Sequence, residues 1–230
     1  MLIDRKPFHD PSELLIFLHL PKTAGVSMHD MLQSVFGEKY FRHSQTLGTL
    51  LSELGQNERS RLQCISGHFK FGVHRQFKQN SVYFTVVRDP VERVVSLYNH
   101  KRRRGKLLKQ YGRNPEIDEW LGDFLRGDEG KPYTQCEAIC GSNCFEEARK
   151  CLVQNYLLYG SLGQLDDLTG VLQEYLGKPN LPPLKRLNTY PDSQEKSIPS
   201  SAMVEILQGH YSQDFSLVSF CEAEFSSRFC

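Results

Sequence analysis

Long hydrophobic runs and a large net charge are both missing from this chain of 230 residues. The longest apolar run, from Leu14 to Leu18, is far shorter than the roughly 20 residues that a membrane-spanning helix needs. The first residues also lack the basic-then-apolar pattern of a secretory signal, so we expect a cytoplasmic protein without a transmembrane segment. A formal net charge of +1 argues against a dedicated nucleic-acid-binding protein, and we expect no nucleic-acid partner.

Cysteine pairs at metal-ligand spacing are absent as well. Four of the seven cysteines, Cys136, Cys140, Cys144 and Cys151, crowd into one stretch without forming the C-x2-C pairs typical of zinc modules. We therefore expect no metal site and interpret these residues as reduced structural thiols, with a local disulfide as the alternative. The chain has no internal repeat, and its length and 39% hydrophobic content predict a single domain over residues 1–230.

Two continuous apolar runs predict buried parallel strands in the first half of the chain. They span Leu14 to Leu18 and Val82 to Val87, and such runs are typical of strands covered by helices on both faces. A shorter strand is expected at Cys64 to Ser66, and helices are expected at Ser27 to Phe36 and Leu47 to Leu62. This alternation predicts an α/β fold with a P-loop-like, doubly wound parallel sheet flanked by helices.

The second half of the chain is expected to be mostly helical. Segments rich in Gly, Pro and charge, Gly105 to Pro115 and Gly127 to Pro132, predict loops between the helices. Five prolines predict an irregular path from Lys178 to Ser200. The predicted helices are Ile117 to Leu125, Phe145 to Leu158, Leu165 to Leu176 and Ala202 to Phe220.

A turn rich in small residues follows the first predicted strand. The segment from Pro21 to Ser27 contains Lys22 and opens the first helical pattern. Backbone N–H groups at a helix start and a nearby lysine both favour negative charge, so this turn predicts an anion-binding site. Gly25 fits that interpretation, because a Cβ at this position would hinder the close approach of an anion. The structural alternative is a surface helix after a strand, with Lys22 simply solvated.

A second segment follows the predicted strand that ends at Val87. Asp89 is a favourable N-cap and Pro90 suits the first helical position, so a helix is expected to begin here. Arg88 then leaves the strand end while Ser96 lies two turns inside the helix, and both side chains can bind a phosphate. Two anion sites on one chain predict a nucleotide with phosphates at both ends. The structural alternative for Arg88 is an ion pair with Asp89 or Glu92.

Together the two segments resemble the phosphate-binding motifs of sulfotransferases that use 3′-phosphoadenosine 5′-phosphosulfate (PAPS). The resemblance runs from about Leu14 to about Phe220 and is greatest to the carbohydrate-type branch, which includes heparan sulfate 2-O-sulfotransferases and bacterial relatives. It implies a PAPS-dependent O-sulfotransferase that transfers a sulfuryl group to a hydroxyl of a carbohydrate or a glycosylated small molecule. PAPS is then the donor substrate, and no metal is required.

The resemblance also implies roles for individual residues. Lys22 would act on the bridging oxygen of the donor as a catalytic residue, while Arg88 and Ser96 would bind the 3′-phosphate. A looser match suggests that Lys185 and Arg186 complete the 3′-phosphate pocket, with an exposed basic loop as the alternative. The residues implied to bind the 5′-phosphosulfate are Lys22, Thr23, Ala24, Gly25, Val26 and Ser27.

The acceptor hydroxyl must lose a proton, and histidine titrates closest to neutral pH among the common bases. His68 follows a predicted strand and a glycine, and it matches the position of the base in the family. His74 is the alternative base, and a structural role is the other interpretation of each residue. The basic run from Lys101 to Lys106 is interpreted as a solvated helix face, with attraction of an anionic nucleotide or acceptor as the alternative and binding to an anionic membrane surface as a third.

Two other functions are alternatives to a sulfotransferase. A noncatalytic nucleotide- or glycan-binding protein with a sulfotransferase fold would carry the same phosphate motifs. A P-loop kinase is disfavoured, because the Walker pattern needs its lysine after the second glycine and Lys22 precedes Gly25. The sequence also offers no convincing strand-end aspartate for magnesium. The identity of the acceptor and the oligomeric state do not follow from these residues.

Overall fold

A parallel sheet of five strands forms the centre of the described chain, which comprises residues 8–43, 54–127, 134–184 and 197–229 of a computed structural model. The strands lie in the order β2-β3-β1-β4-β5, and every neighbouring pair is parallel. They are β1 (Leu14–Leu18), β2 (Tyr40–His43), β3 (Cys64–Gly67), β4 (Ser81–Val87) and β5 (Tyr156–Ser161). The predicted parallel α/β sheet is confirmed.

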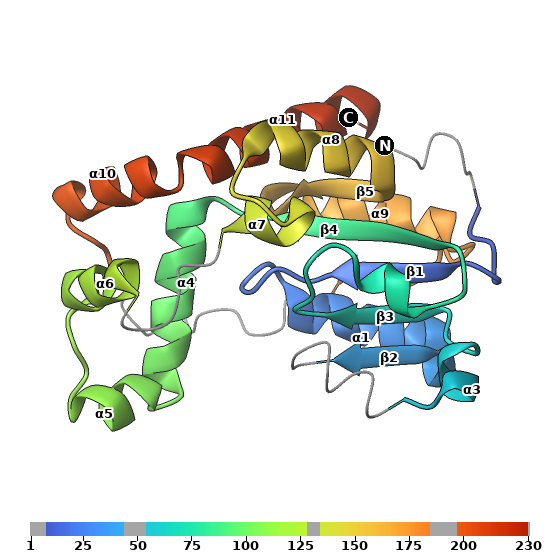
Figure 1. The fold of residues 1–230 in the computed structure, drawn as a ribbon, viewed down its shortest axis with the longest axis horizontal. Helices are drawn as coiled ribbons and strands as arrows, with labels where there is room; N and C mark the ends of the chain where they lie inside the picture. The colour runs from blue at the N-terminus through green and yellow to red at the C-terminus, as the bar shows by residue number, and fades with distance from the viewer. Residues whose placement is uncertain (1–7, 44–53, 128–133, 185–196, 230) are drawn as a thin grey trace.

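The pairing register places the carboxyl ends of three central strands at one edge of the sheet. Leu18 in β1 lies opposite Gly67 at the end of β3, and Phe17 lies opposite Phe84 in β4. The residues of β1 are completely buried, as expected for an apolar strand that is covered on both faces. The loops that follow β1, β3 and β4 therefore leave the sheet on the same side, which faces helix α4 (Pro90–Arg103) in Figure 1.

Helices cover both faces of the sheet, as a doubly wound fold requires. Helix α1 (Gly25–Phe36) packs against β2 and β3, and α9 (Leu165–Tyr175) packs against β5; both lie behind the sheet in Figure 1. The short helix α7 (Gln135–Cys140) lies in front of the sheet, and α8 (Phe145–Asn155) and α11 (Ser212–Phe229) run along the edge strand β5. Within the described ranges, no helix has the length and apolar character needed to cross a membrane.

Helices α4, α5 (Lys106–Tyr111), α6 (Ile117–Arg126) and α10 (Ser201–His210) form a second hydrophobic cluster beside the sheet. They gather on the left of Figure 1. Trp120 is fully buried in this cluster, and its ring centre lies 5.6 Å from that of Tyr98. The expected helical second half is thereby confirmed, and the single-domain organisation of residues 1–230 stays a prediction.

Strand β5 lies where the sequence predicts the end of a helix. The predicted helix from Phe145 to Leu158 ends at Asn155, and the chain continues directly into β5. All residues of β5 are buried. A short buried apolar run has no periodicity that separates a strand from a core helix, so the prediction is wrong at its carboxyl end.

Other segments also differ from the predicted elements. The helix predicted over Leu47 to Leu62 is wrong where the structure describes it, because α3 covers only Gln56–Arg59; residues 47–53 lie outside the described residues. The predicted loop from Gly105 to Pro115 contains α5, and the helix predicted over Ala202 to Phe220 is divided into α10 and α11 at Tyr211. Strand β2 and helix α7 have no counterpart among the predicted elements, whereas the remaining predicted strands and helices are confirmed.

Candidate functional site

The turn between β1 and α1 has an unusual backbone conformation. Lys22 and Ala24 have positive φ angles of 73° and 60°, and they are the described non-glycine residues with this property. Ala24 is also the N-cap of α1 and makes no side-chain cap hydrogen bond to the first turn. Left-handed residues in a turn orient backbone N–H groups toward a common point, which makes an anion-binding concavity. The local backbone therefore fits the anion-binding turn that the sequence predicts.

Thr23 and Gly25 support this turn from inside the protein. The Thr23 hydroxyl donates a 2.8 Å hydrogen bond to the Leu20 carbonyl oxygen, and its side chain is completely buried. A Cβ on Gly25 would collide with the imidazole ring of His19, which itself stacks on Phe17. Glycine is thus required here for packing against His19. The sequence suggested that this glycine leaves room for an anion, but the group nearest to the position of its missing Cβ is the His19 ring.

Arg88 connects the two predicted phosphate motifs. Its Nη1 atom lies 3.2 Å from the Lys22 carbonyl oxygen, to which it donates a hydrogen bond. Its Nη2 atom also forms a 3.2 Å ion pair with Glu92, as in the structural alternative for this residue. The Glu92 side chain is 65% exposed, so the ion pair is weak and open to competition from a bound phosphate. Asp89 caps α4 by accepting a hydrogen bond from the Glu92 N–H, which confirms the predicted helix start.

One face of α4 adds further positive charge near Lys22. Ser96, His100 and Arg103 are spaced by four and three residues, so they share a face of the helix. Burial, followed by the charges of Arg103 and Arg88, lowers the pKa of Lys22 to about 8. Burial and the charge of Lys22 likewise lower the pKa of His100 to about 4. Burial is the larger cause of both shifts, and the added effects of the neighbouring charges show that several cationic side chains lie close to Lys22.

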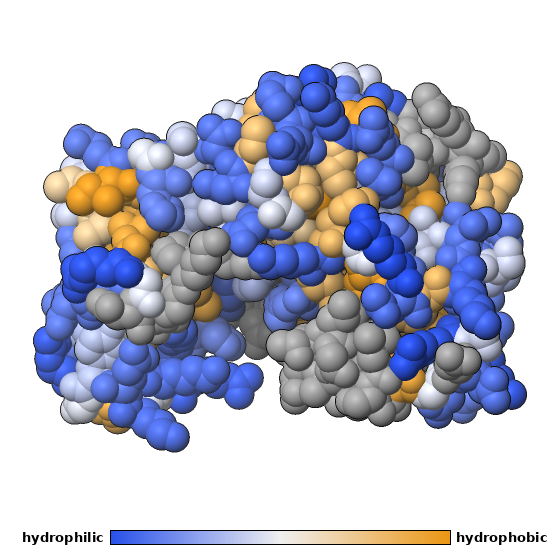
Figure 2. All heavy atoms as spheres, viewed as in Figure 1, coloured by the Kyte–Doolittle hydropathy of each residue, from blue (hydrophilic) through white to orange (hydrophobic). Residues whose placement is uncertain are grey.

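His100 and Arg103 are thus additions to the predicted site. The sequence contained two signals, namely the helical spacing of both residues from Ser96 and the place of Arg103 in the basic run from Lys101 to Lys106. Figure 2 shows an indentation between the helices on the left of the view and the part of the molecule that contains the sheet, and hydrophilic atoms line its left side. The same view of the ribbon shows the turn after β1 pointing toward α4 (Figure 1).

His68 lies directly after β3, at the same edge of the sheet. Its Nδ1 atom is 2.9 Å from the His19 carbonyl oxygen. Because a carbonyl oxygen only accepts hydrogen bonds, Nδ1 carries the proton and Nε2 keeps its lone pair. Desolvation lowers the pKa of His68 below its usual value, although its side chain remains accessible to solvent. The exposed imidazole is therefore neutral at pH 7 and able to accept a proton at Nε2.

A buried polar network lies beneath this edge. The His29 Nδ1 atom is 2.6 Å from the Tyr40 hydroxyl and 2.8 Å from the Ser66 hydroxyl, and the two hydroxyls are 2.5 Å apart. Burial lowers the pKa of His29 to about 3 and raises the pKa of Tyr40. The network joins α1, β2 and β3 through neutral groups, so His29 has a structural role.

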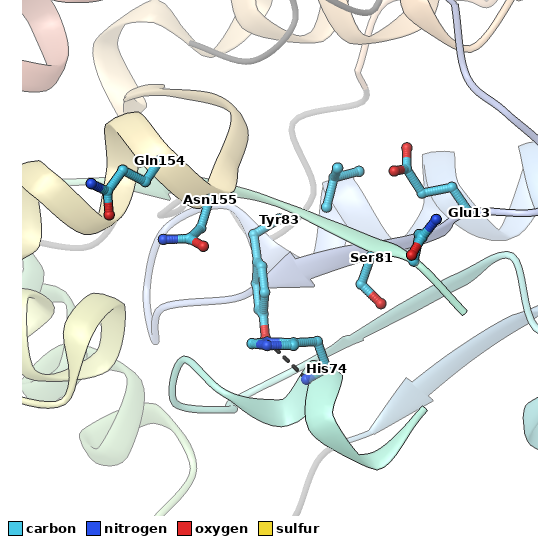
Figure 3. A pocket seen from close by; sticks show the side chains of 8 residues that line it. Glu13, His74, Ser81, Tyr83, Gln154 and Asn155 are labelled. Carbon is cyan, nitrogen blue, oxygen red and sulfur yellow. Dashed lines mark hydrogen bonds between the residues drawn. The ribbon is translucent and has the colours of Figure 1, made fainter. Parts of the chain in front are cut away.

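His74 lies in a different part of the molecule from the turn between β1 and α1. Its Nδ1 atom is 2.7 Å from the Tyr83 hydroxyl, and both residues line a cavity of about 300 Å³. Figure 3 shows this cavity with Glu13, Ser81 and Asn155, which stand at or just before the amino ends of β1, β4 and β5. A second cavity, of about 620 Å³, lies near the amino ends of β2 and β3. His68 thus contacts the segment that leads into the turn between β1 and α1, whereas His74 lies beside this cavity.

The remaining predicted residues lie as follows. Ser27 is buried in the first turn of α1, whereas the Val26 side chain is exposed. Lys185 and Arg186, the predicted completion of the 3′-phosphate pocket, lie outside the described residues. The clustered cysteines are free thiols in the structure, without the alternative local disulfide; they are Cys136, Cys140, Cys144 and Cys151.

Comparison with known proteins assigns the family. Residues 6–159 match the model of the sulfotransferase family, which covers most of this chain. The chain belongs to the sulfotransferase family.

Three relatives called heparan sulfate 2-O-sulfotransferase 1 illustrate the similarity. The protein from Mus musculus is 27% identical over 162 residues, which is 60% of this chain and 44% of the relative. The one from Gallus gallus is 30% identical over 125 residues, or 46% of this chain and 33% of the relative. The one from Xenopus laevis is 24% identical over 201 residues, or 73% and 56%. The chain thus matches about half of the length of these relatives or less.

Replacing Ala24 by glycine tests the backbone conformation of the turn between β1 and α1. Because Ala24 has a φ of 60°, an Ala24→Gly variant should be more stable than the parent by about 0.5–1 kcal/mol. Chemical denaturation followed by circular dichroism measures this difference. Ala202→Gly is the matched control, since Ala202 lies in helix α10 and glycine there should destabilise by about 1 kcal/mol. Destabilisation by both substitutions would contradict the left-handed conformation of Ala24.

Proposed function

We propose that this protein is a PAPS-dependent O-sulfotransferase that acts on a hydroxyl of a carbohydrate or a glycosylated small molecule. The observation that carries the proposal is the 3.2 Å contact between the Arg88 guanidinium and the Lys22 carbonyl oxygen. It joins two cationic motifs that are 66 residues apart in the chain. Membership of the sulfotransferase family supports the donor, and the names of the relatives, heparan sulfate 2-O-sulfotransferase 1, support a carbohydrate acceptor.

The donor would be bound from both ends. The backbone N–H groups at the start of α1, together with Lys22, would bind the 5′-phosphosulfate, as helix N-termini commonly bind anions. Arg88 and Ser96 would bind the 3′-phosphate, and Lys185 and Arg186 would complete that pocket. The proximity of Arg88 and Arg103 to Lys22 supports this arrangement. We propose that no metal is required, because these side chains supply the positive charge that the transition state needs.

In the proposed reaction, the acceptor oxygen forms a bond to sulfur while the bond from sulfur to the bridging oxygen of the donor breaks. The proton of the acceptor hydroxyl passes to Nε2 of His68. The products are a sulfate ester and 3′-phosphoadenosine 5′-phosphate (PAP). Negative charge increases on the bridging oxygen during bond breaking, and the Lys22 ammonium would stabilise it there. The hydrogen bond from His68 Nδ1 to the His19 carbonyl oxygen supports this role by orienting the imidazole.

Selective binding of PAP is the first test of the proposal. PAP at ~100-fold over its dissociation constant should stabilise the protein by about 2.7 kcal/mol and raise its unfolding temperature. ATP at the same concentration should raise that temperature less, because it has no 3′-phosphate. Arg88→Ala should reduce the PAP shift, whereas Arg113→Ala, which removes the exposed ion pair with Glu119, should leave it unchanged. Equal shifts with PAP and ATP would count against the proposed donor.

Removal of the proposed base separates catalysis from nucleotide binding. His68→Ala should abolish sulfuryl transfer while the affinity for PAP stays within about twofold, because His68 accepts a proton and is not expected to bind the nucleotide. Transfer from labelled PAPS to heparan sulfate, a probe suggested by the names of the relatives, measures the first effect, and calorimetry measures the second. His74→Ala is the comparison variant and should retain transfer. Normal turnover by His68→Ala would remove this assignment, and PAP binding without transfer by the unmodified protein would favour the noncatalytic alternative.

The lowered pKa of Lys22 predicts a pH dependence of PAP affinity. With a pKa of about 8, the Lys22 ammonium is charged below about pH 8 in the free protein, and a bound phosphate would raise that pKa further. The affinity should therefore be highest below about pH 8 and fall as the pH rises above it. Calorimetric titration between about pH 7 and pH 9.5 measures the profile. Lys22→Arg should flatten it, because arginine stays protonated throughout this range; a flat profile for the unmodified protein would contradict the role of Lys22.

A further inference from the structure

Gln135 holds the main chain of Arg88 in place. Its Oε1 atom accepts a 2.9 Å hydrogen bond from the Arg88 N–H, and its Nε2 atom donates a 2.7 Å hydrogen bond to the Arg88 carbonyl oxygen. Gln135 is the first residue of α7, and its side chain is completely buried. Arg88 directly follows the last residue of β4, so the amide supplies the donor and acceptor that a neighbouring strand would supply.

Asp214 in α11 fixes the position of Gln135. Its Oδ2 atom accepts a 2.8 Å hydrogen bond from the Gln135 N–H, and its Oδ1 atom accepts a 3.0 Å hydrogen bond from the Cys136 N–H. Asp214 is completely buried, and a buried carboxylate needs such donors to offset its lost hydration. The Thr134 side chain accepts a further hydrogen bond, from the Glu137 N–H, at the same end of α7. Asp214 in α11 therefore holds the backbone at the start of α7, and this backbone carries the Gln135 amide.

Only a glutamine combines the required groups at this length. Its amide offers one acceptor and two donors, whereas glutamate at neutral pH offers acceptors alone. Asparagine has the same amide on a side chain that is one methylene shorter, so it cannot reach both Arg88 atoms from the same helix position. The two bonds hold the Arg88 main chain at both polar groups, so the guanidinium can move only by rotations within the Arg88 side chain.

The direction of the Arg88 side chain depends on this main-chain position. Arginine binds phosphate through a planar fork, and small misplacements of such a group are costly. We propose that Gln135 is a positioning residue, which sets the direction of the Arg88 guanidinium and thereby the recognition of the 3′-phosphate. This inference rests on the proposed function. Gln135 touches no reacting atom, so its effect is expected on nucleotide discrimination and not on the transfer step.

A comparison of two nucleotides tests the inference. PAP and adenosine 5′-monophosphate (AMP) both have a 5′-phosphate, and only PAP has a 3′-phosphate. Gln135→Leu should weaken PAP binding about tenfold, which corresponds to about 1.4 kcal/mol, and leave AMP binding unchanged in calorimetric titrations. Gln173→Leu is the matched control: Gln173 is a buried glutamine in α9 whose Nε2 atom lies near the Met31 sulfur, away from Arg88. It should leave the ratio of the two affinities unaltered.

A double-mutant cycle shows whether Gln135 acts through Arg88. In an Arg88→Ala background, Gln135→Leu should cause no further loss of PAP affinity, because the group that it positions is gone. Gln135→Asn is the second variant if Gln135→Leu does not fold, and the same loss of PAP discrimination is expected for it.

Two kinds of result would overturn the inference, and they differ in what else they affect. If the unmodified protein prefers PAP over AMP and the Gln135 variants keep that preference, or weaken both nucleotides equally, Gln135 does not position Arg88 and the proposed function stands. If the unmodified protein has no preference for PAP, the proposed function and this inference both fail. A selective loss of PAP affinity that disappears in the Arg88→Ala background supports the inference.

Discussion

The contact between the Arg88 guanidinium and the Lys22 carbonyl oxygen depends on one constraint, the parallel register of the central strands. Parallel pairing brings the carboxyl ends of β1, β3 and β4 to a single edge, and each of these strands is followed by a residue of the candidate site. An antiparallel arrangement would distribute Lys22, His68 and Arg88 over both edges. The buried apolar strands therefore determine where the polar chemistry can take place.

The site also depends on neutral groups that hold charged ones in place. The His19 carbonyl oxygen accepts a hydrogen bond from His68 Nδ1, and the His19 ring occupies the space beside Gly25. Gln135 holds the main chain of Arg88 without adding charge. Lys22, Arg88 and Arg103 thereby bring cationic side chains together at this edge, and the ion pair of Arg88 is with the exposed Glu92, an arrangement suited to a polyanionic ligand.

Much of the fold and part of the site could be predicted from the sequence, because their signals are local. Continuous apolar runs marked β1 and β4, and the order of Asp89 and Pro90 marked the start of α4. The helix that ends at Asn155 was predicted too long, because the apolar run that follows it is compatible with either element. The two anion-binding segments suggested one nucleotide with phosphates at both ends, and the family resemblance strengthened that pairing, but no local pattern states that Arg88 contacts the Lys22 backbone.

The parts of the site that the sequence did not reveal depend on contacts between residues that are far apart in the chain. Asp214 supports Gln135 from 79 residues away, and neither residue has a pattern around it that suggests a partner. The central claim is that the turn at Lys22 and the pair Arg88 and Ser96 hold opposite ends of one nucleotide. A crystal structure of the protein with PAP tests it most directly: the 5′-phosphate should lie against the first turn of α1 and Lys22, and the 3′-phosphate against Arg88 and Ser96. A nucleotide bound elsewhere, for example in the cavity at the amino ends of the strands, would contradict the account.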